Sequence, residues 1–332
     1  MLIAVSGASG HTGRFVVAEL RRRGHTVIAI GRDQAKLLAR AFDGGVETRV
    51  AAIDDPSSLD RALSGAAALI HCAGPFLDTA EALIEAALRA RIHYFDVTAE
   101  QTSALSTFER FDAAARERGI VVAPASGFYG GLGDLLASAA MSGWTSADEI
   151  DVAIALDSWW PTMGTRRTSQ RNTAPRLILA GGKLEQLQPS PPVPWRFPEP
   201  FGLQEVVELP FTETILMHRH LSVATIHNYL NQTPLRDLRD PATPEPVAVD
   251  ERGRSKQLFL IDVVVRNGNQ KRRILARGRD IYAVTAPLVT QAVERVSDGS
   301  FQRAGAFALG EMFDAAEFLQ ALTPDQLTLS TA

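Results

Sequence analysis

Three glycines at three-residue spacing stand near the start of the chain, directly after an apolar run from Leu2 to Val5. A strand that ends in such a turn lets the backbone approach a phosphate without an interfering Cβ atom, and the helix that follows offers free N–H groups. We expect this turn to bind the pyrophosphate of a dinucleotide. The residues concerned are Gly7, Ala8, Ser9, Gly10, His11, Thr12 and Gly13. The alternative is an ordinary glycine turn that binds nothing.

A second strand, Val27–Ile30, ends in Gly31-Arg32-Asp33, and this segment indicates which dinucleotide binds. An acidic residue at this strand end favours the ribose hydroxyls of NAD, whereas an arginine favours the 2′-phosphate of NADP. We therefore expect Arg32 to bind that phosphate, with Lys36 as a weaker helper, and NADP(H) to be the cofactor. The alternative for Arg32 is a solvated side chain. Asp33 is either a ribose ligand or the N-cap of the next helix.

Two further segments follow strands whose carboxyl ends would line the same crevice. Asp54 comes after the expected third strand, Thr48–Ile53, and either reaches the adenine or caps a helix. The fourth strand, Ala67–Cys72, leads into a short turn whose backbone should approach the ribose or the nicotinamide. That turn consists of Ala73, Gly74 and Pro75.

Residues at the ends of later strands are the candidate proton donors for a reaction at this crevice. Asp96, Thr98 and Glu100 would share one side of the fifth strand if it continued that far. Asp96 and Tyr129 are the candidate catalytic groups, because each can exchange a proton with a reacting carbonyl, imine or enoyl carbon. A purely structural role for both is the alternative. No tyrosine is followed four residues later by lysine, so the proton relay of ordinary short-chain dehydrogenases is missing.

Composition restricts the class of protein. With 332 residues, 45% of them hydrophobic and 22% charged, the chain can bury a full core and most naturally forms two domains. A formal net charge of −4 argues against nucleic acid as the main ligand. One cysteine, Cys72, excludes internal disulfides. Apolar runs do not reach membrane-spanning length, and no charged leader precedes an apolar core, so we expect a cytoplasmic protein without a membrane partner.

Strands and helices alternate up to about residue 125, which predicts an α/β fold with a Rossmann-type, doubly wound parallel sheet. The later region is rich in strands. Glu149–Leu156 alternates as a half-buried strand, and Asn267-Gly268 predicts the turn of a hairpin between Gln257–Val265 and the segment 271–276. We therefore expect a second, α+β domain built on a mixed or antiparallel sheet.

Four segments together resemble the NADP-binding domain of saccharopine dehydrogenase-like proteins, a family that includes saccharopine reductases and trans-acting enoyl reductases. They are the glycine turn at 6–13, Gly31-Arg32-Asp33, the Cys72–Phe76 segment and the His93–Glu100 segment. Pro124–Asp134 is similar to the glycine-rich segment after the sixth strand of that family, and Asp280–Ala286 resembles it more faintly.

The resemblance implies NADP(H) and a two-domain oxidoreductase with the reaction in the cleft between the domains. It also implies that the first domain is discontinuous. We expect residues 1–128 and about 284–325 to form the NADP-binding domain, and 129–283 to form a domain for substrate binding and dimerisation. A homodimer through the second sheet is a further expectation.

Several features of the second region bear on its role. Trp159 and Trp160 either stack on a ligand or plug the domain interface. The segment Thr165–Asn172 gathers arginines and hydroxyls, as an anion site would, although a solvated basic strand is the alternative. Two proline-rich segments, Pro189–Pro200 and Pro234–Ser255, should be irregular surface loops or lids.

Three histidines are the candidates for a metal site. The spacing of His218 and His220 would place both on one face of a strand, and His227 follows. No cysteine pair or helical His-Glu pattern completes a ligand set, so we expect no metal.

The leading functional hypothesis is an NADP-dependent oxidoreductase acting on a small metabolite, which the basic segment at 165–172 suggests is an anion. The alternative is a non-catalytic sensor that binds NADP(H) to set its conformation. A third hypothesis is an epimerase or dehydratase whose nicotinamide cofactor shows no net redox change.

Overall fold

The first domain is built on seven parallel strands. The computed structural model describes residues 1–40, 42 and 44–331. The strands are β1 (Leu2–Ser6), β2 (Thr26–Gly31), β3 (Val46–Val50), β4 (Ala68–His71), β5 (His93–Asp96), β6 (Val121–Ala123) and β15 (Gly305–Ala306). They lie in the order β15-β6-β5-β4-β1-β2-β3, which is the order of a Rossmann sheet with one strand added. The expected doubly wound parallel sheet is confirmed.

Helices cover both faces of this sheet, and the alternation of side chains along β1 shows how. Ile3 and Val5 belong to the core shared with α1 (His11–Arg22) and α10 (Ile281–Ser297). Ala4 points to the opposite face. That face is packed against α3 (Pro56–Leu63), α4 (Phe76–Ala90) and α5 (Gln101–Arg118), while α2 (Gln34–Ala39) lies between β2 and β3.

The second domain is built on a mixed sheet. Its strands are β7 (Ala147–Leu156), β8 (Leu177–Ala180), β9 (Lys183–Gln186), β10 (Val193–Arg196), β11 (Leu203–Glu208), β12 (Val223–Asn231), β13 (Leu258–Asn267), β14 (Gln270–Arg279) and β16 (Leu327–Thr331). The order is β10-β11-β12-β7-β13-β14-β16, and a branch pairs β8 with both β12 and β9. Strands β12 and β7 run parallel, and the other neighbours run antiparallel. The expected second domain on a mixed sheet is confirmed.

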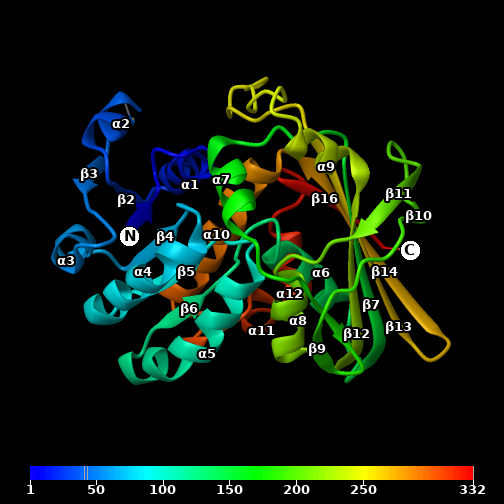
Figure 1. Cartoon of the computed structure of the whole chain (residues 1–332). Coiled ribbons are helices and arrows are strands. Elements are labelled where there is room, and N and C mark those ends of the chain that lie inside the picture. The colour runs from blue at the N-terminus through cyan, green and yellow to red at the C-terminus, as the bar shows by residue number, and fades with distance from the viewer. Residues whose placement is uncertain (41, 43, 332) are drawn as a thin grey trace.

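The remaining helices belong to this half of the molecule or join it to the first. They are α6 (Gly131–Ala140), α7 (Met163–Arg171), α8 (Glu213–His220), α9 (Gln232–Arg239), α11 (Leu309–Met312) and α12 (Ala315–Gln320). Figure 1 shows the first domain, coloured blue to cyan, beside the second, coloured green to orange, with α7 near the boundary between them. The two domains therefore lie side by side along this boundary.

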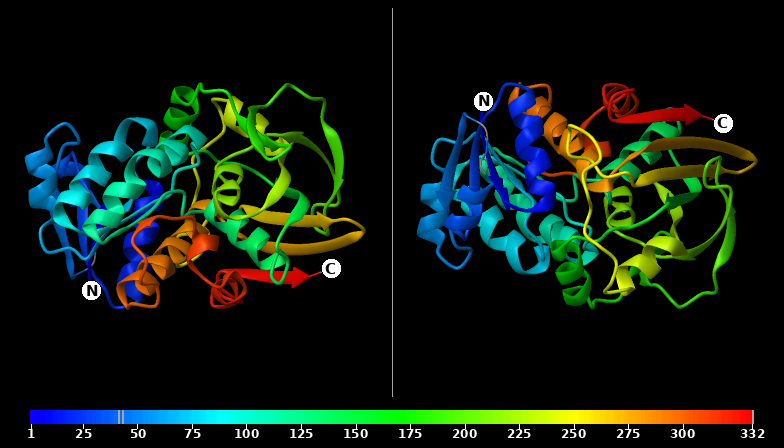
Figure 2. Two further views of the ribbon diagram at one scale, coloured as in Figure 1. Left: turned by 90° about the horizontal axis from the view of Figure 1, so that it is seen from below. Right: turned by 90° about the horizontal axis from the view of Figure 1, so that it is seen from above.

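The chain crosses between the domains more than once. After β14, helix α10 packs against α1, and β15 adds to the first sheet beside β6. The last strand, β16, then pairs with β14 of the second sheet. Figure 2 shows this strand, in red, lying along the orange hairpin of β13 and β14. The C-terminal segment thus contributes to both domains, and the division at 128 and 284 stays a prediction.

Several element boundaries differ from those expected. Strand β3 covers 46–50 and not 48–53, because Ser58 and the Asp55 cap of α3 hold the chain at 52–55 in a turn. Strand β5 ends at Asp96, so Thr98 and Glu100 lie beyond it. Helix α10 begins at Ile281, several residues earlier than expected, because the Asp280 carboxylate accepts hydrogen bonds from its first turn.

Four expectations for the second domain were wrong in secondary structure. The segment with Arg166 and Arg171 is helix α7 and not a strand, with Thr162 as its N-cap. His218 and His220 end helix α8, so their spacing of two residues does not place them on one face. The proline-rich segment 189–200 includes β10, which tolerates Pro194 because it is the edge of the sheet. Part of the segment from Pro234 belongs to α9.

Candidate active site

A continuous cleft of about 1590 Å³ runs along the boundary between the two domains. The first domain contributes the glycine turn and the chain that follows β2, β3 and β4, and the second contributes much of 159–172 and an aromatic wall. Expected cofactor residues that line this cleft are Gly7, Ser9, Gly10, His11, Thr12, Arg32, Asp54, Ala73, Gly74 and Pro75. Ala8 and Gly13 are buried behind the turn, and Asp33 does not line the cleft.

The glycine turn is held by backbone contacts that leave no room for side chains. Gly7 has φ +78°, and a Cβ atom there would lie 2.7 Å from the Cβ of Ala73. A Cβ atom on Gly13 would lie 2.2 Å from the carbonyl oxygen of Gly7. Helix α1 then begins with Gly10 as its N-cap and without a side-chain cap. Its first N–H groups are therefore available to a phosphate.

Two arginines stand at the outer end of this half of the cleft. Arg32 follows β2, is exposed, and makes no hydrogen bond or ion pair with the residues described. Arg40, at the end of α2, also lines the cleft, and its Nε donates to the carbonyl oxygen of Ser9 at 2.8 Å. The sequence analysis missed Arg40. Its position two turns after the Gly31-Arg32 segment is the signal that could have identified it.

The acidic residues near this end divide between capping and the cleft. The Asp33 carboxylate accepts a hydrogen bond from the N–H of Lys36 at 3.1 Å and caps α2. Asp55, and not Asp54, caps α3 by accepting from Ser58 N at 3.1 Å. Asp54 therefore does not cap α3, and it lines the cleft.

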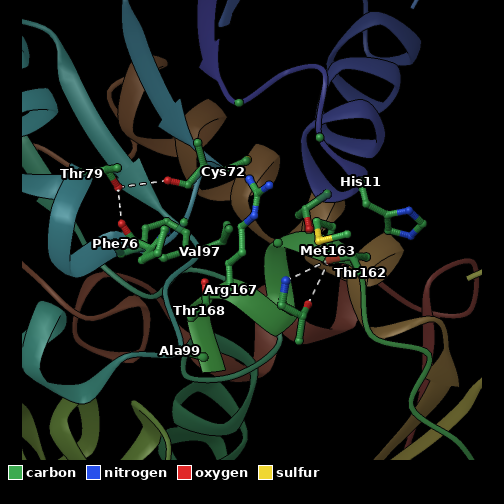
Figure 3. Close-up of a pocket in the computed structure, with 18 of the residues that line it drawn as sticks. His11, Cys72, Phe76, Thr79, Val97, Ala99, Thr162, Met163, Arg167 and Thr168 are labelled. Carbon is green, nitrogen blue, oxygen red and sulfur yellow. Dashed lines mark hydrogen bonds between the residues drawn. The ribbon is translucent and has the colours of Figure 1, made fainter. Parts of the chain in front are cut away.

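The turn after β4 is fixed by a buried histidine. Thr79 Oγ1 donates to the carbonyl oxygens of Ala73 and Pro75, so it accepts from the His71 Nε2 at 2.9 Å. Burial lowers the pKa of His71 to about 3, and the ring stays neutral. Figure 3 shows Thr79 and its bonds beside Phe76 at this wall of the cleft. The turn at 73–75 is thus held rigid by hydrogen bonds behind it.

Asp96 is placed differently from what a catalytic role requires. Its carboxylate is fully buried, does not line the cleft, and accepts hydrogen bonds from Ala125 N at 2.8 Å, Thr98 N at 3.0 Å and the hydroxyl of Tyr94 at 3.0 Å. Burial raises its pKa to about 6 against the effect of these donors. The geometry favours a structural role, in which Asp96 ties the end of β5 to the loop at 125.

Glu100 lines the cleft but is also engaged. Its two carboxylate oxygens accept from the N–H groups of Phe76 at 2.7 Å and Leu77 at 3.1 Å, at the start of α4. Burial raises its pKa, and these two N–H donors act in the opposite direction. Glu100 therefore caps α4 from a distant part of the chain.

Tyr129 belongs to an aromatic wall on the second-domain side of the cleft. Its ring lies 4.1 Å from that of Phe211, 5.0 Å from Phe128 and 5.8 Å from Trp159, measured between centroids. The Tyr129 hydroxyl is buried and has no hydrogen-bond partner in the described part of the chain. Burial raises its pKa well above the ordinary value, so the group keeps its proton at neutral pH.

A buried carboxylate and a half-buried arginine flank this wall. Glu213, at the start of α8, accepts from Gly130 N at 2.8 Å, and burial raises its pKa to about 7. Arg176 lines the cleft, lies 4.9 Å from the ring centroid of Phe211 and donates to the carbonyl oxygen of Pro210 at 2.7 Å. Burial lowers the pKa of Arg176, although an arginine remains charged.

Helix α7 lines the cleft on the second-domain side, and two of its three arginines have partners among the described residues. Arg166 donates to backbone carbonyls at 238–243, and Arg171 pairs with Asp78 on α4 at 2.8 Å. Arg167 lines the cleft and makes no hydrogen bond or ion pair with the residues described. Figure 3 shows Arg167 reaching from α7 toward the first domain. Of the three arginines in the expected anion site, Arg167 is the one without a partner among the described residues.

Tyr282 connects α7 to the first domain and was not singled out from the sequence. Its hydroxyl accepts from Trp159 Nε1 at 2.9 Å and lies 2.8 Å from the hydroxyl of Thr165. The ring of His11 contacts that of Tyr282 edge to face, and burial lowers the pKa of His11 to about 4. Trp159 is thus buried at the domain interface and also lines the cleft.

Two of the three candidate metal ligands, His220 and His227, lie beside carboxylates outside the cleft. His220 Nε2 lies 2.7 Å from Asp134, and His227 Nδ1 lies 2.7 Å from Glu208. Over the described ranges, no group of three His, Cys, Asp or Glu side chains is arranged to hold a metal ion. None of the helices described is long and apolar enough to cross a membrane.

Comparison with known proteins finds sequence matches for the first domain, which forms one side of the cleft. Residues 3–122 match the family model described as the saccharopine dehydrogenase NADP binding domain. The bovine (Bos taurus) saccharopine dehydrogenase-like oxidoreductase is 28% identical over 145 residues, which are 38% of this chain and 34% of that protein. The chain thus matches about a third of the length of this curated relative. The expected resemblance is confirmed: residues 3–122 match the saccharopine dehydrogenase NADP binding domain, and NADP(H) is the cofactor of this part of the chain.

Solved structures extend the likeness in fold to the whole chain. Saccharopine dehydrogenase (L-Glu forming) from Saccharomyces cerevisiae superposes with a TM-score of 0.71 and 14% identity, over 100% of this chain and 99% of that one. An amine dehydrogenase from Mycobacterium smegmatis gives a TM-score of 0.51 and 13% identity, over 94% and 96% of the two chains. At such identities these matches establish the two-domain architecture.

Proposed function

We propose that the protein is an NADP-dependent oxidoreductase that transfers hydride between NADP(H) and a small metabolite held in the cleft between the two domains. One observation carries the proposal. The cleft that begins at the glycine turn continues without interruption to Tyr129 and the aromatic wall of the second domain. A cofactor and a second ligand can therefore meet in one site, as hydride transfer requires.

The residues present fit a dinucleotide phosphate. The uncapped start of α1 offers N–H groups to a phosphate, and a Cβ atom on Gly13 would disrupt the turn by clashing with the Gly7 carbonyl oxygen. Arg32 lines the same cleft and has no partner among the described residues. Arg32 would bind the 2′-phosphate together with Arg40, whose contact with Ser9 holds it beside the turn. Turnover with NADPH should accordingly exceed turnover with NADH, and equal rates would contradict this assignment.

The chemistry supplied by bound NADPH is a hydride for an electrophilic carbon. In a carbonyl substrate that carbon accepts the hydride and the oxygen accepts a proton, so one NADPH and one proton yield an alcohol and NADP⁺. Tyr129 would donate a hydrogen bond from its hydroxyl group to that oxygen. The residue lines the cleft, and its hydroxyl group keeps its proton and has no other partner among the described residues. The turn at 73–75 would position the nicotinamide from the opposite wall.

The test is NADPH consumption by the purified protein against panels of keto acids, aldehydes, enoyl thioesters and keto acids with an amine. Tyr129→Phe should lower kcat by about 10²- to 10⁴-fold, the usual contribution of a general acid, and leave the affinity for NADPH unchanged. Tyr229→Phe, on β12 outside the cleft, is the matched control. Tight NADPH binding without turnover of any class would favour the sensor instead.

Two further proposals concern the protein as a whole. A homodimer through the second sheet stays a prediction, and the mass of the protein in solution checks it. A cytoplasmic location also stays a prediction, which fractionation of cells would test.

A further inference from the structure

We infer that the second-domain half of the cleft binds an organic carboxylate with an apolar body and no ammonium group, and that Arg176 is the anchor of the carboxylate. This inference rests on the proposed function, because it describes the substrate of the proposed hydride transfer.

Arg176 has the geometry of a prepared anion site. Its guanidinium lies 4.9 Å from the ring centroid of Phe211 and donates one hydrogen bond, to the carbonyl oxygen of Pro210. A guanidinium has five N–H groups, and the rest of those on Arg176 have no partner in the described part of the chain. Because the side chain is held by these two contacts and half-buried at the cleft, little further ordering is needed when an anion binds.

Arg167 is less suited to this task. It is exposed, and no hydrogen bond or ion pair to the described residues fixes its side chain. None of the residues of α7, all of which are described, is buried. Arg167 therefore contributes to the field of the cleft, whereas Arg176 provides a fixed position for the carboxylate.

The charges around Arg176 favour an anion over a substrate ammonium. The acidic residue that the second domain contributes to the cleft is Glu245, and its carboxylate already accepts from Met163 N at 2.9 Å. Across the cleft, Asp78 is paired with Arg171, and Glu100 accepts two backbone N–H groups. Glu213 does not line the cleft. Each carboxylate that lines this part of the cleft thus already has a hydrogen-bond or ion-pair partner among the described residues, which disfavours an ammonium there.

The neighbouring surface predicts the rest of the molecule. Phe128, Tyr129, Trp159, Leu209 and Phe211 all line the cleft beside Arg176. Such a wall recognises an alkyl or aryl body by burial of apolar surface. The cleft volume of about 1590 Å³ exceeds the roughly 300–1,000 Å³ typical of one ligand pocket, which leaves room for this second ligand beside the dinucleotide.

The experiment uses matched probes on the full-length protein saturated with NADP⁺. Phenylpropanoate, phenylpropanamide and phenylalanine share one body, and hexanoate, hexanamide and norleucine share another. Titration calorimetry should show each acid binding at least about 10-fold tighter than its amide and its amino acid, because a charged hydrogen bond is gained or an unpaired ammonium is avoided.

Arg176→Gln should weaken binding of the acids by about 10- to 100-fold and remove their advantage over the amides, with NADP⁺ affinity unchanged. Arg176→Lys should retain part of that advantage, and it replaces the Gln variant if that one does not fold. Arg196→Gln removes an exposed arginine outside the cleft and is the control.

Three results would overturn the inference. They are equal binding of acids and amides, tighter binding of the amino acids, and an undiminished preference in Arg176→Gln. If NADP⁺ binds but none of the acids does, the inference fails and the proposed function stands. If NADP⁺ itself does not bind, the proposed function fails, and the inference fails with it.

Discussion

The two halves of the cleft differ in the atoms that form their surface, which are largely backbone on one side and side chains on the other. On the first-domain side, backbone forms the surface: the glycine turn, the uncapped start of α1 and the turn at 73–75. On the second-domain side, side chains form it, among them Tyr129, Phe211 and Arg176. The glycine turn of the first half is fixed by close main-chain contact, whereas the second half depends on how α7, α8 and the surrounding loops pack.

This difference explains how one architecture can keep a cofactor while its ligands vary. Backbone N–H groups recognise phosphate regardless of the side chains around them, and any added Cβ atom in the turn is excluded by contact. Side chains on the facing wall can be exchanged one at a time without altering that turn. The second half is therefore the place where specificity is set.

The largest expected effect comes from disturbing the backbone half. Gly13→Ala places a Cβ atom 2.2 Å from the carbonyl oxygen of Gly7, and neither group belongs to a flexible side chain. We expect a loss of unfolding free energy of more than about 3 kcal/mol, the upper end for overpacking, together with loss of NADP⁺ binding. Denaturant unfolding and NADP⁺ titration measure the two effects.

Gly24→Ala, at the other end of α1, is the control for Gly13→Ala. Gly24 has φ +83° but no atom within 4 Å of the added Cβ. Its cost should be about 1–2 kcal/mol from backbone strain alone, with NADP⁺ affinity unchanged. Normal stability and cofactor affinity in Gly13→Ala would show that the turn is not fixed by this contact.

The next effect concerns the side-chain half, where a buried carboxylate carries an electrostatic cost. Glu213 is fully buried behind Tyr129, and one of its carboxylate oxygens has no hydrogen-bond partner among the described residues. Burial raises its pKa from 4.5 to about 7. The folded state thus holds a proton that the unfolded state releases, and this contribution to stability is lost as pH rises through about 7.

Glu213→Gln does not titrate, and its amide oxygen can still accept from Gly130 N. Relative to wild type, its unfolding free energy should rise by about 2.5 kcal/mol between pH 5 and pH 8. Urea unfolding at the two pH values measures the change. Asp262→Asn, which breaks a buried pair with Arg273, should destabilise at both and serves as control. An identical difference between Glu213→Gln and wild type at both pH values would contradict a raised pKa.

Sequence reasoning succeeded where local chemistry decides the structure. The spacing of Gly7, Gly10 and Gly13 predicts the turn because only backbone conformation and contact distance matter there, and residues 3–122 match the family model of that domain. Alternating strands and helices predict the parallel sheet for the same reason. The expected hairpin is present as β13 and β14, although its two-residue turn is Gly268-Asn269 and Asn267 still belongs to the strand.

Prediction from the sequence failed where contacts with distant segments decide the role of a side chain. Asp96 stands at a strand end, as a catalytic acid would, but Ala125, far along the chain, engages its carboxylate. Glu100 caps α4 from beyond β5, and Arg176 reaches the cleft from a loop before β8. Such assignments depend on contacts between residues far apart in sequence, which composition and spacing do not contain.

The smallest effect tests whether the side-chain half can move. Asp78 on α4 and Arg171 on α7 form an ion pair across the cleft at 2.8 Å, with 43% and 56% of their side chains exposed. Asp78→Asn should lower the unfolding free energy by only about 0.2–1 kcal/mol. Because no residue of the fully described helix α7 is buried, the same loss should raise hydrogen exchange of residues 163–171 by about 1.5- to 5-fold.

Asp60→Asn breaks an equally exposed pair with Arg89, within the first domain, and should leave exchange in α7 unchanged. Salt should reduce the effect of Asp78→Asn, because it screens exposed charges. Unchanged exchange of α7 in Asp78→Asn would mean that Arg166 and Tyr282 alone hold this helix, and the side-chain half would then be as rigid as the backbone half.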